Sequence, residues 1–262
     1  MIALAPDEVY VPEKEYEDYA SRLDGLRARM VMELPLEPRM RILDVATGSA
    51  LFAIELAKRD PSLKIVAIDV SDKAIRIADR RIREKWLDPH VTTMKMDATR
   101  LEFQGGSFGM AVNFMGLDDV DMTRGDQGVR QAFHEVARVL RPRGYFCFTI
   151  IPPGEAETPA QKLEAEVYAH ACGAKWLPAI RYQEYLRGAG FTLVKKEVFY
   201  TGKKLRAAQA RLEIEAAIEN AKSHDVEPLT FEEVWKKYGK EIEENGLGHA
   251  SRVVLMIARR AA

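Results

Sequence analysis

Short, uninterrupted apolar runs alternate with amphipathic stretches, and this alternation constrains the fold more than any other feature of the sequence. The apolar runs do not alternate with polar residues, which predicts strands buried on both faces of a sheet. The predicted strands are 41–45, 64–68, 91–96, 109–114, 145–151, 191–200 and 251–258. Helical patterns cover 51–59, 71–86 and 127–140. This succession predicts an α/β fold, with a mostly parallel seven-stranded sheet that carries helices on both faces.

The organisation of the chain is predicted to be one domain, 1–262. An N-terminal helical segment (1–38) precedes a core at 39–200, and the last strand lies in 250–262. Between them, 202–245 is rich in helix formers and is predicted to be a helical insertion. Because ligands of open α/β sheets bind beyond the carboxyl ends of the strands, we expect this insertion to cap that edge. The alternative is an outer helical layer, or a contact between copies of the chain in a homo-oligomer.

Composition narrows the class of protein. The 262 residues are 47% hydrophobic and 30% charged, which is typical of a globular chain and not of a disordered one. A net charge of -1 argues against a protein that coats nucleic acid. The two cysteines allow no disulfide framework and no metal spacing, so no metal is expected. Neither a signal-peptide pattern nor a membrane-spanning apolar run is present, so we expect a cytoplasmic protein.

The turn after the first strand of the core carries small residues at alternate positions. Asp44 is followed by Ala46, Gly48 and Ala50, directly before a predicted helix. Such a turn lets backbone N–H groups approach a ligand closely at a helix N-terminus. Tight strand–helix turns that bind nothing use the same residues, so the turn alone leaves both interpretations open.

Two acidic residues follow the next two strands. Asp69 ends the strand at 64–68, and a carboxylate there can accept hydrogen bonds from both hydroxyls of a ribose. Ser71 supplies the cap of the following helix, so Asp69 is not needed for that role. Asp97 directly follows the next strand, where it can accept a hydrogen bond from the exocyclic amine of adenine. Both features favour a nucleoside ligand, and neither distinguishes a nicotinamide cofactor from S-adenosylmethionine.

Three later segments carry a family resemblance. Residues 101–108, 138–144 and 186–191 resemble the segments that precede the fourth, fifth and sixth strands of class I S-adenosylmethionine-dependent methyltransferases. With the two earlier turns, the resemblance extends in order from Arg41 to Phe199. It is closest to the small-molecule methyltransferases that include the quinone-biosynthesis enzymes. It implies a Rossmann-like, doubly wound sheet, S-adenosyl-L-methionine as the cofactor, and a small-molecule methyl acceptor.

The resemblance also implies roles for individual residues. Asp44 would face the amine of the methionine, and Asp69 and Asp97 would hold ribose and adenine. The remaining cofactor-binding residues that it implies are Tyr19, Ala46, Thr47, Gly48, Ala50, Val70, Ala98, Asn113 and Phe114. Four positions depart from the family pattern: Ala46 and Ala50 replace glycine, Gly109 replaces aspartate, and Arg143 replaces the first glycine of a Pro-Gly-Gly turn.

Candidates for a catalytic or substrate-binding role are few, because methyl transfer needs mainly positioning and sometimes a base. Asp118 and Asp119 could deprotonate an acceptor or bind a cationic amine, although they could equally decorate a loop. We expect His134 on a helix surface and His249 in a turn. Tyr168, Trp176 and Tyr182 either line an aromatic pocket or belong to the core.

Three alternative functions were weighed. A short-chain dehydrogenase needs Tyr-x-x-x-Lys after the fourth strand, and the only match, Tyr10 to Lys14, precedes the first strand. A methyltransferase acting on protein or RNA remains an alternative, although the Pro152-Pro153 segment lacks the Asn and aromatic residues of RNA enzymes. A non-catalytic paralogue that binds S-adenosylmethionine is the third.

Overall fold

The computed structural model describes residues 8–13, 23–173, 176–223 and 226–262. The chain forms two compact units. The core unit consists of residues 24–150, 180–197 and 255–262. The second unit takes in the N-terminal residues up to Leu23, together with 151–179 and 198–254. Two long strands, β7 (Phe191–Tyr200) and β10 (Arg252–Arg260), run without interruption from one unit into the other.

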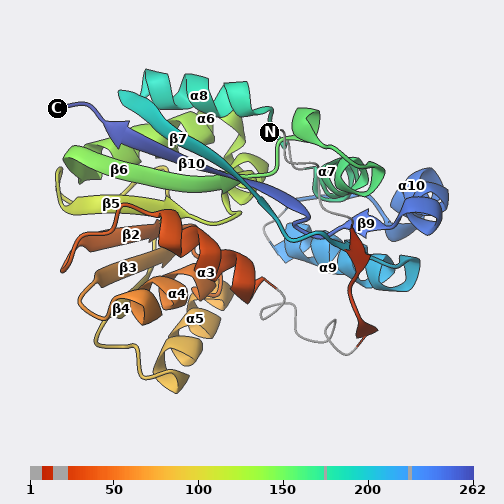
Figure 1. Cartoon of the computed structure of the whole chain (residues 1–262), viewed down its shortest axis with the longest axis horizontal. Coiled ribbons are helices and arrows are strands. Elements are labelled where there is room, and N and C mark those ends of the chain that lie inside the picture. Colours follow the sequence, from red (N-terminus) through yellow and green to blue (C-terminus); the bar gives the residue numbers. More distant parts are fainter. Residues whose placement is uncertain (1–7, 14–22, 174–175, 224–225) are drawn as a thin grey trace. The chain divides into compact units, whose positions relative to one another are not determined.

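The core unit is built on a seven-stranded sheet in the order β4-β3-β2-β5-β6-β10-β7 (Figure 1). The first five strands in that order are β4 (Val91–Lys95), β3 (Lys64–Asp69), β2 (Arg41–Val45), β5 (Phe108–Asn113) and β6 (Leu140–Ile150). Their pairings are all parallel, as continuous apolar runs predict. Every residue of β5, the central strand, is buried. The predicted seven-stranded, mostly parallel sheet is confirmed.

The direction of β10 follows from the residue beyond its end. The Ala261 N–H donates to Gly190 O, just before β7, and Ala261 O accepts from Arg143 N near the start of β6. The end of β10 therefore lies at the beginnings of both neighbours, and β10 is antiparallel to them. A strand that comes last in the chain is thus inserted between two earlier ones.

Helices cover both faces of the sheet. Strand order runs outward from β2 through β3 to β4, and in the opposite direction from β5 to β6. Because crossovers between parallel strands are right-handed, the helices α4 (Leu51–Arg59) and α5 (Asp72–Glu84) lie on one face and α6 (Leu117–Val139) on the other (Figure 1). Helix α3 (Asp24–Glu33) packs on α4, and α8 (Ala179–Gly188) contacts α6 through Tyr185 and Phe133. This is a doubly wound, Rossmann-like arrangement.

Several element bounds differ from the sequence prediction. Helix α6 begins at Leu117, ten residues before the predicted start at 127, because Gly125 adopts φ 68° and ψ -177° and kinks the helix without ending it. Strand β6 begins at Leu140 and not at 145, so the predicted turn at 141–144 belongs to the strand. Strand β10 extends to Arg260, two residues beyond its predicted end.

The second unit has its own small sheet, which the sequence did not predict. Its strands are β1 (Val9–Tyr10), β8 (Lys203–Leu205) and β9 (Leu247–Gly248), in the order β1-β8-β9. The helices α7 (Pro159–Cys172), α9 (Ala207–Ser223) and α10 (Phe231–Asn245) pack on one another, and the 3-10 turn η1 (Pro153–Glu155) precedes α7. Within 202–245, α9 and α10 are helical and β8 is a strand. The role of this segment as a cap, and the single-domain organisation, stay predictions.

A buried carboxyl group ties the second unit together. Glu164 of α7 accepts hydrogen bonds from the backbone N–H of Ala250 at 2.5 Å and of Ser251 at 3.4 Å. The Ser251 hydroxyl in turn donates to Glu8 at 2.5 Å. Burial raises the pKa of Glu164 to about 7. Both cysteines of the chain are buried. Within the described ranges, no helix is long and apolar enough to cross a membrane.

Candidate cofactor site

The turn between β2 and α4 owes its shape to three left-handed residues. Ala46, Gly48 and Ala50 have φ values of 50°, 56° and 60°. These are the alternate small positions of the sequence, and left-handed backbone explains why small residues occupy them. Thr47 fixes the turn, because its N–H donates to Ile68 O at 2.9 Å and its hydroxyl donates to Asp44 at 2.5 Å.

Asp44 lies beneath this turn with only 1% of its surface exposed. Burial is the main cause that raises the pKa of its carboxyl group to about 7, and the nearby Asp69 carboxylate adds to the effect. The hydrogen bond from Thr47 opposes the shift without cancelling it. Asp44 is therefore poised to lose its proton when a cation arrives beside it.

Asp69, at the end of β3, connects two turns. One oxygen accepts from the Gly48 N–H at 2.8 Å, and the other accepts from the Ser71 N–H at 2.9 Å. Each carboxylate oxygen has a second lone pair, so both can still accept a hydroxyl donor. Ser71 caps α5 through the Ala74 N–H, as predicted.

Asp97 follows β4 and is also held by its neighbours. One oxygen accepts from the Thr99 N–H at 2.8 Å and from the Thr99 hydroxyl at 2.7 Å, and the other accepts from Arg124 Nε at 2.9 Å. Partial burial opposes ionisation, but these hydrogen bonds and the Arg124 charge outweigh it and lower the pKa of Asp97. A Cβ atom on Gly128 would lie 2.1 Å from the Arg124 Cβ, so glycine leaves the space that the arginine stem occupies.

The loops after β2 and β5 meet where the strand order reverses, which is the place where ligands bind in doubly wound sheets. The Asn113 side chain donates to Val45 O at 2.7 Å and accepts from the Gly116 N–H at 3.3 Å. A Cβ atom on Gly116 would come within 2.8 Å of Ala46 O, so the loops approach too closely for any larger residue. Both polar atoms of the Asn113 side chain thus form hydrogen bonds that hold the two loops together.

Apolar surfaces lie beside these polar groups. Phe114 stacks on Phe52, with ring centroids 5.3 Å apart, and the buried guanidinium of Arg27 lies 5.2 Å from the Phe114 centroid. Val70, directly after Asp69, is 38% exposed, whereas Ala98 is buried. An exposed valine directly after Asp69 offers a surface on which a flat ring can pack.

Asp118 lies in the first turn of α6, immediately beyond the Asn113 loop. It accepts a hydrogen bond from the Tyr182 hydroxyl of α8 at 3.3 Å. Desolvation first, and then the charges of Asp119 and Asp121, raise the pKa of Asp118 to about 7. Asp119 is exposed on the same turn. Of the two interpretations that the sequence left open, a position in a loop does not hold, because both acids belong to the first turn of a helix.

The remaining candidate residues of the sequence analysis that the structure describes lie outside these carboxylate-bearing turns and loops. Tyr19 lies outside the described residues. His134 is exposed on α6, as predicted, and Tyr182 is buried in the core beside Phe148. In the second unit, His249 is buried after β9, and Tyr168 stacks on Trp176 at 5.8 Å.

Five residues that shape the site were not predicted. Arg124 and Arg27 reach their partners through tertiary contacts that no local pattern shows. Gly116 and the pair Gly125 and Gly128 were visible in the sequence, but their meaning depends on which backbone lies opposite. Within the described residues no group of His, Cys, Asp and Glu could hold a metal ion.

Carboxylates that follow three adjacent parallel strands, together with a tight turn at the switch point, are typical of Rossmann-like proteins that bind a nucleoside. Residues 42–144 match the family model of a methyltransferase domain. The chain is 34% identical over 100 residues to the demethylmenaquinone methyltransferase of Porphyromonas gingivalis (38% of each chain). It is 26% identical over 175 residues to that of Lactobacillus johnsonii (60% of this chain, 68% of the relative).

The fold is also found in solved structures. The crystal structure of the [4+2]-cyclase SpnF superposes with a TM-score of 0.67 at 20% identity, over 99% of this chain and 88% of that one. This likeness concerns the fold alone. The Porphyromonas gingivalis relative is matched over only 38% of its own length. Over part of its length the chain is therefore similar to methyltransferases.

Proposed function

We propose that this protein transfers the methyl group of S-adenosylmethionine to a small-molecule acceptor. Asp69 binds the ribose hydroxyls, Asp97 accepts from the adenine amine, and Val70 packs on the adenine ring. The turn at Ala46–Ala50 presents its backbone to the methionine and ribose. The cofactor supplies the electrophilic methyl group, and the protein supplies position and a base.

The observation that carries the proposal is the raised pKa of the buried Asp44 carboxyl group. A buried carboxyl group with a pKa near 7 costs stability when it ionises, unless a cation joins it. The α-amine of the cofactor is such a cation, and it is present in both S-adenosylmethionine and S-adenosylhomocysteine. Binding therefore requires that Asp44 lose its proton, and affinity has to rise with pH through the pKa of this group.

Calorimetry with S-adenosylhomocysteine between pH 6 and pH 8 tests this role. Binding should strengthen about tenfold over that range, because about one carboxyl in ten is ionised at the lower pH. Asp44→Asn should remove the pH dependence, whereas Asp119→Asn, which alters an exposed acid of the same unit, should preserve it. Tight binding of NAD without any response to S-adenosylhomocysteine would reject the proposal as a whole.

Asp118 is the residue that we assign as the general base. With a pKa near 7 it is partly ionised at neutral pH, and the Tyr182 hydroxyl holds it in place. Asp118 would take a proton from the acceptor and later return it to water, and S-adenosylmethionine, when bound, would supply the methyl group.

The acceptor can be sought with methyl-labelled cofactor and a metabolite extract freed of macromolecules. The rate of label transfer should rise with pH to a plateau above about 7 and fall by about 10²–10⁴ in Asp118→Asn. The control is Asp88→Asn, which alters an exposed acid of the same unit outside the candidate site. Label that appears only when protein or RNA is supplied would favour the alternative of a macromolecular acceptor.

A further inference from the structure

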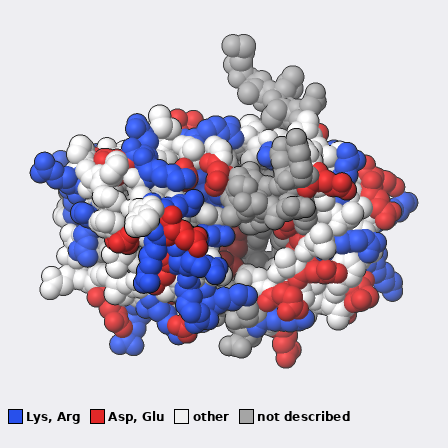
Figure 2. Space-filling view, turned by 90° about the horizontal axis from the view of Figure 1, so that it is seen from below, with Lys and Arg blue, Asp and Glu red and all other residues white. Residues whose placement is uncertain are grey.

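Helix α5 carries a basic stripe, defined here as Lys73, Arg76, Arg80 and Arg83. The spacing of three, four and three residues places them on one side of the helix. All four are exposed, while Ala78 and Ile82 on the opposite side are buried against the sheet. Figure 2 looks at the side on which α5 lies in Figure 1, and it shows Lys and Arg side chains gathered on the left part of this face.

Acidic neighbours compensate the charges of the stripe only in part. Across the part of the chain that the structure describes, Lys73, Arg76 and Arg80 form no ion pair, although the charge of Arg76 helps to lower the pKa of Asp72. Arg83 pairs with Asp79, with Nη2 3.7 Å from its carboxylate. The protein as a whole has a net charge of -1, so this concentration of positive charge is local. A stripe with an excess of positive charge attracts an anionic surface.

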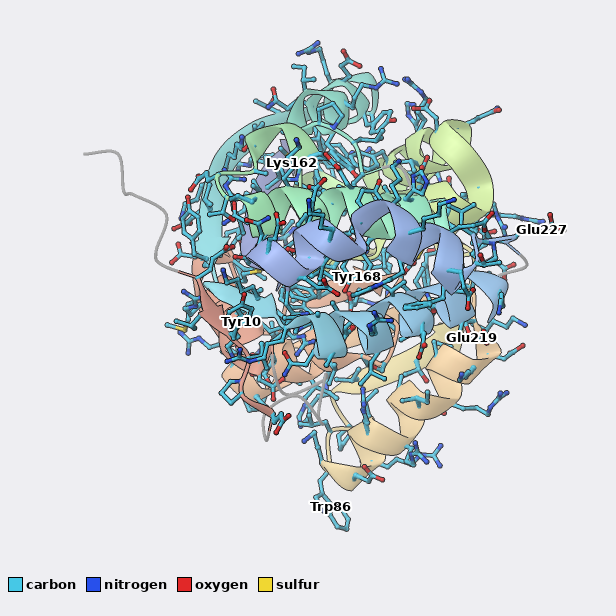
Figure 3. The ribbon with its side chains drawn as sticks, turned by 90° about the vertical axis from the view of Figure 1, so that its right-hand side faces the viewer. Tyr10, Trp86, Lys162, Tyr168, Glu219 and Glu227 are labelled. Carbon is cyan, nitrogen blue, oxygen red and sulfur yellow. The ribbon has the colours of Figure 1, made fainter. Side chains whose placement is uncertain are left out.

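Trp86 lies at the end of the same helix and is 84% exposed. Its indole extends away from the ribbon (Figure 3). The backbone of Trp86 has φ 58°, and the Leu87 N–H donates across it to Ile82 O at 3.0 Å. This is the left-handed position of a helix C-cap, which normally holds glycine. A tryptophan there is strained and gains nothing from burial, so the fold itself does not explain it.

We propose that the basic stripe and Trp86 form a docking surface for an anionic lipid bilayer. The positive side chains meet the lipid headgroups, and the indole enters the headgroup region, where its apolar ring and its N–H are both accommodated. Single-stranded nucleic acid fits less well, because stacking platforms need aromatic residues interleaved with the charges. Here one aromatic residue stands at the end of the stripe.

Co-sedimentation with lipid vesicles tests the proposal, using phosphatidylcholine alone and phosphatidylcholine mixed with phosphatidylserine. The parent protein should sediment only with the mixed vesicles, and added salt should release it. The double variant Arg76→Glu/Arg80→Glu should lose at least about tenfold in partitioning. The matched control is Lys236→Glu/Lys240→Glu, which makes the same charge change at exposed residues of α10 and should partition like the parent.

Trp86→Gly separates docking from folding. Glycine relieves the left-handed strain, so this variant should be at least as stable as the parent to thermal unfolding while its vesicle binding falls severalfold. Equal losses in the α5 variant and the α10 control would overturn the proposal. So would sedimentation that ignores phosphatidylserine, an unstable Trp86→Gly, or binding to a single-stranded RNA with no binding to either kind of vesicle.

Discussion

Replacing Gly116 by alanine is the sharpest test of how the two site loops fit together. The new Cβ would lie 2.8 Å from Ala46 O, 2.9 Å from Asn113 Nδ2 and 3.0 Å from Ala46 Cβ. Gly116 has φ -124°, which alanine adopts without strain, so the effect comes from contact alone. None of the three atoms belongs to the end of a flexible side chain that can turn away freely.

The magnitude follows from these contacts. Overpacking of a closely packed site costs about 1–3 kcal/mol. If the loops part to make room, the hydrogen bond from Asn113 to Val45 is weakened, which costs about 1 kcal/mol more. The displaced turn includes Gly48, whose N–H holds Asp69, so we expect weaker binding of S-adenosylhomocysteine together with lower stability.

Urea denaturation and calorimetry measure the two effects. The control is Gly188→Ala at the exposed end of α8, where an added Cβ meets nothing within 4 Å. It should match the parent in both assays. A Gly116→Ala protein whose free energy of unfolding stays within ~0.5 kcal/mol of the parent, with unchanged affinity, would refute the close approach of the loops.

Two further predictions concern other charged groups. Because the folded-state pKa of Glu164 is raised to about 7, the folded protein binds an extra proton between pH 5 and 7 and loses stability as pH rises. Glu164→Gln should flatten that decline by up to about 1.4 kcal/mol per pH unit in urea titrations, and a slope like that of the parent would contradict it. Arg124→Met should strengthen S-adenosylhomocysteine binding about fivefold by calorimetry, because a donor that competes with adenine for Asp97 is removed. Gly128→Ala, which displaces the Arg124 stem, should shift the affinity in the same direction, and weaker binding in both would show that Arg124 helps to hold the ligand.

The sequence predicted the sheet well, because buried parallel strands are continuous apolar runs and each end is marked by a turn. The sequence-based prediction failed where a local pattern was compatible with two structures, or where an element was too short to show a pattern. The helix predicted over 127–140 begins at Leu117, because the chain kinks at Gly125 and the helix continues across it. The strands β1, β8 and β9 contain two or three residues each, too few for any periodicity to show.

For the candidate site, the positions of Asp44, Asp69 and Asp97 could be predicted because the carboxyl ends of parallel strands meet at one edge. The groups that hydrogen-bond to each carboxylate could not be predicted. Arg124 hydrogen-bonds to Asp97, 27 residues away in the sequence. This pairing depends on the kink at Gly125 and on the space that Gly128 leaves for the arginine, and neither can be inferred before the helix is folded.

The insertion of β10 between β6 and β7 has a consequence for the order of events during synthesis. Residues 252–260 leave the ribosome after every other strand of the sheet. Until then, the edge of β6 is open and β7 has no neighbour to pair with. A nascent chain of this protein therefore exposes a long, apolar strand edge, which is the kind of surface that chaperones bind and that drives aggregation. Slow translation of the final segment should prolong that exposure, and a variant that weakens β10 should lower the yield of folded protein more than its equilibrium stability alone would predict.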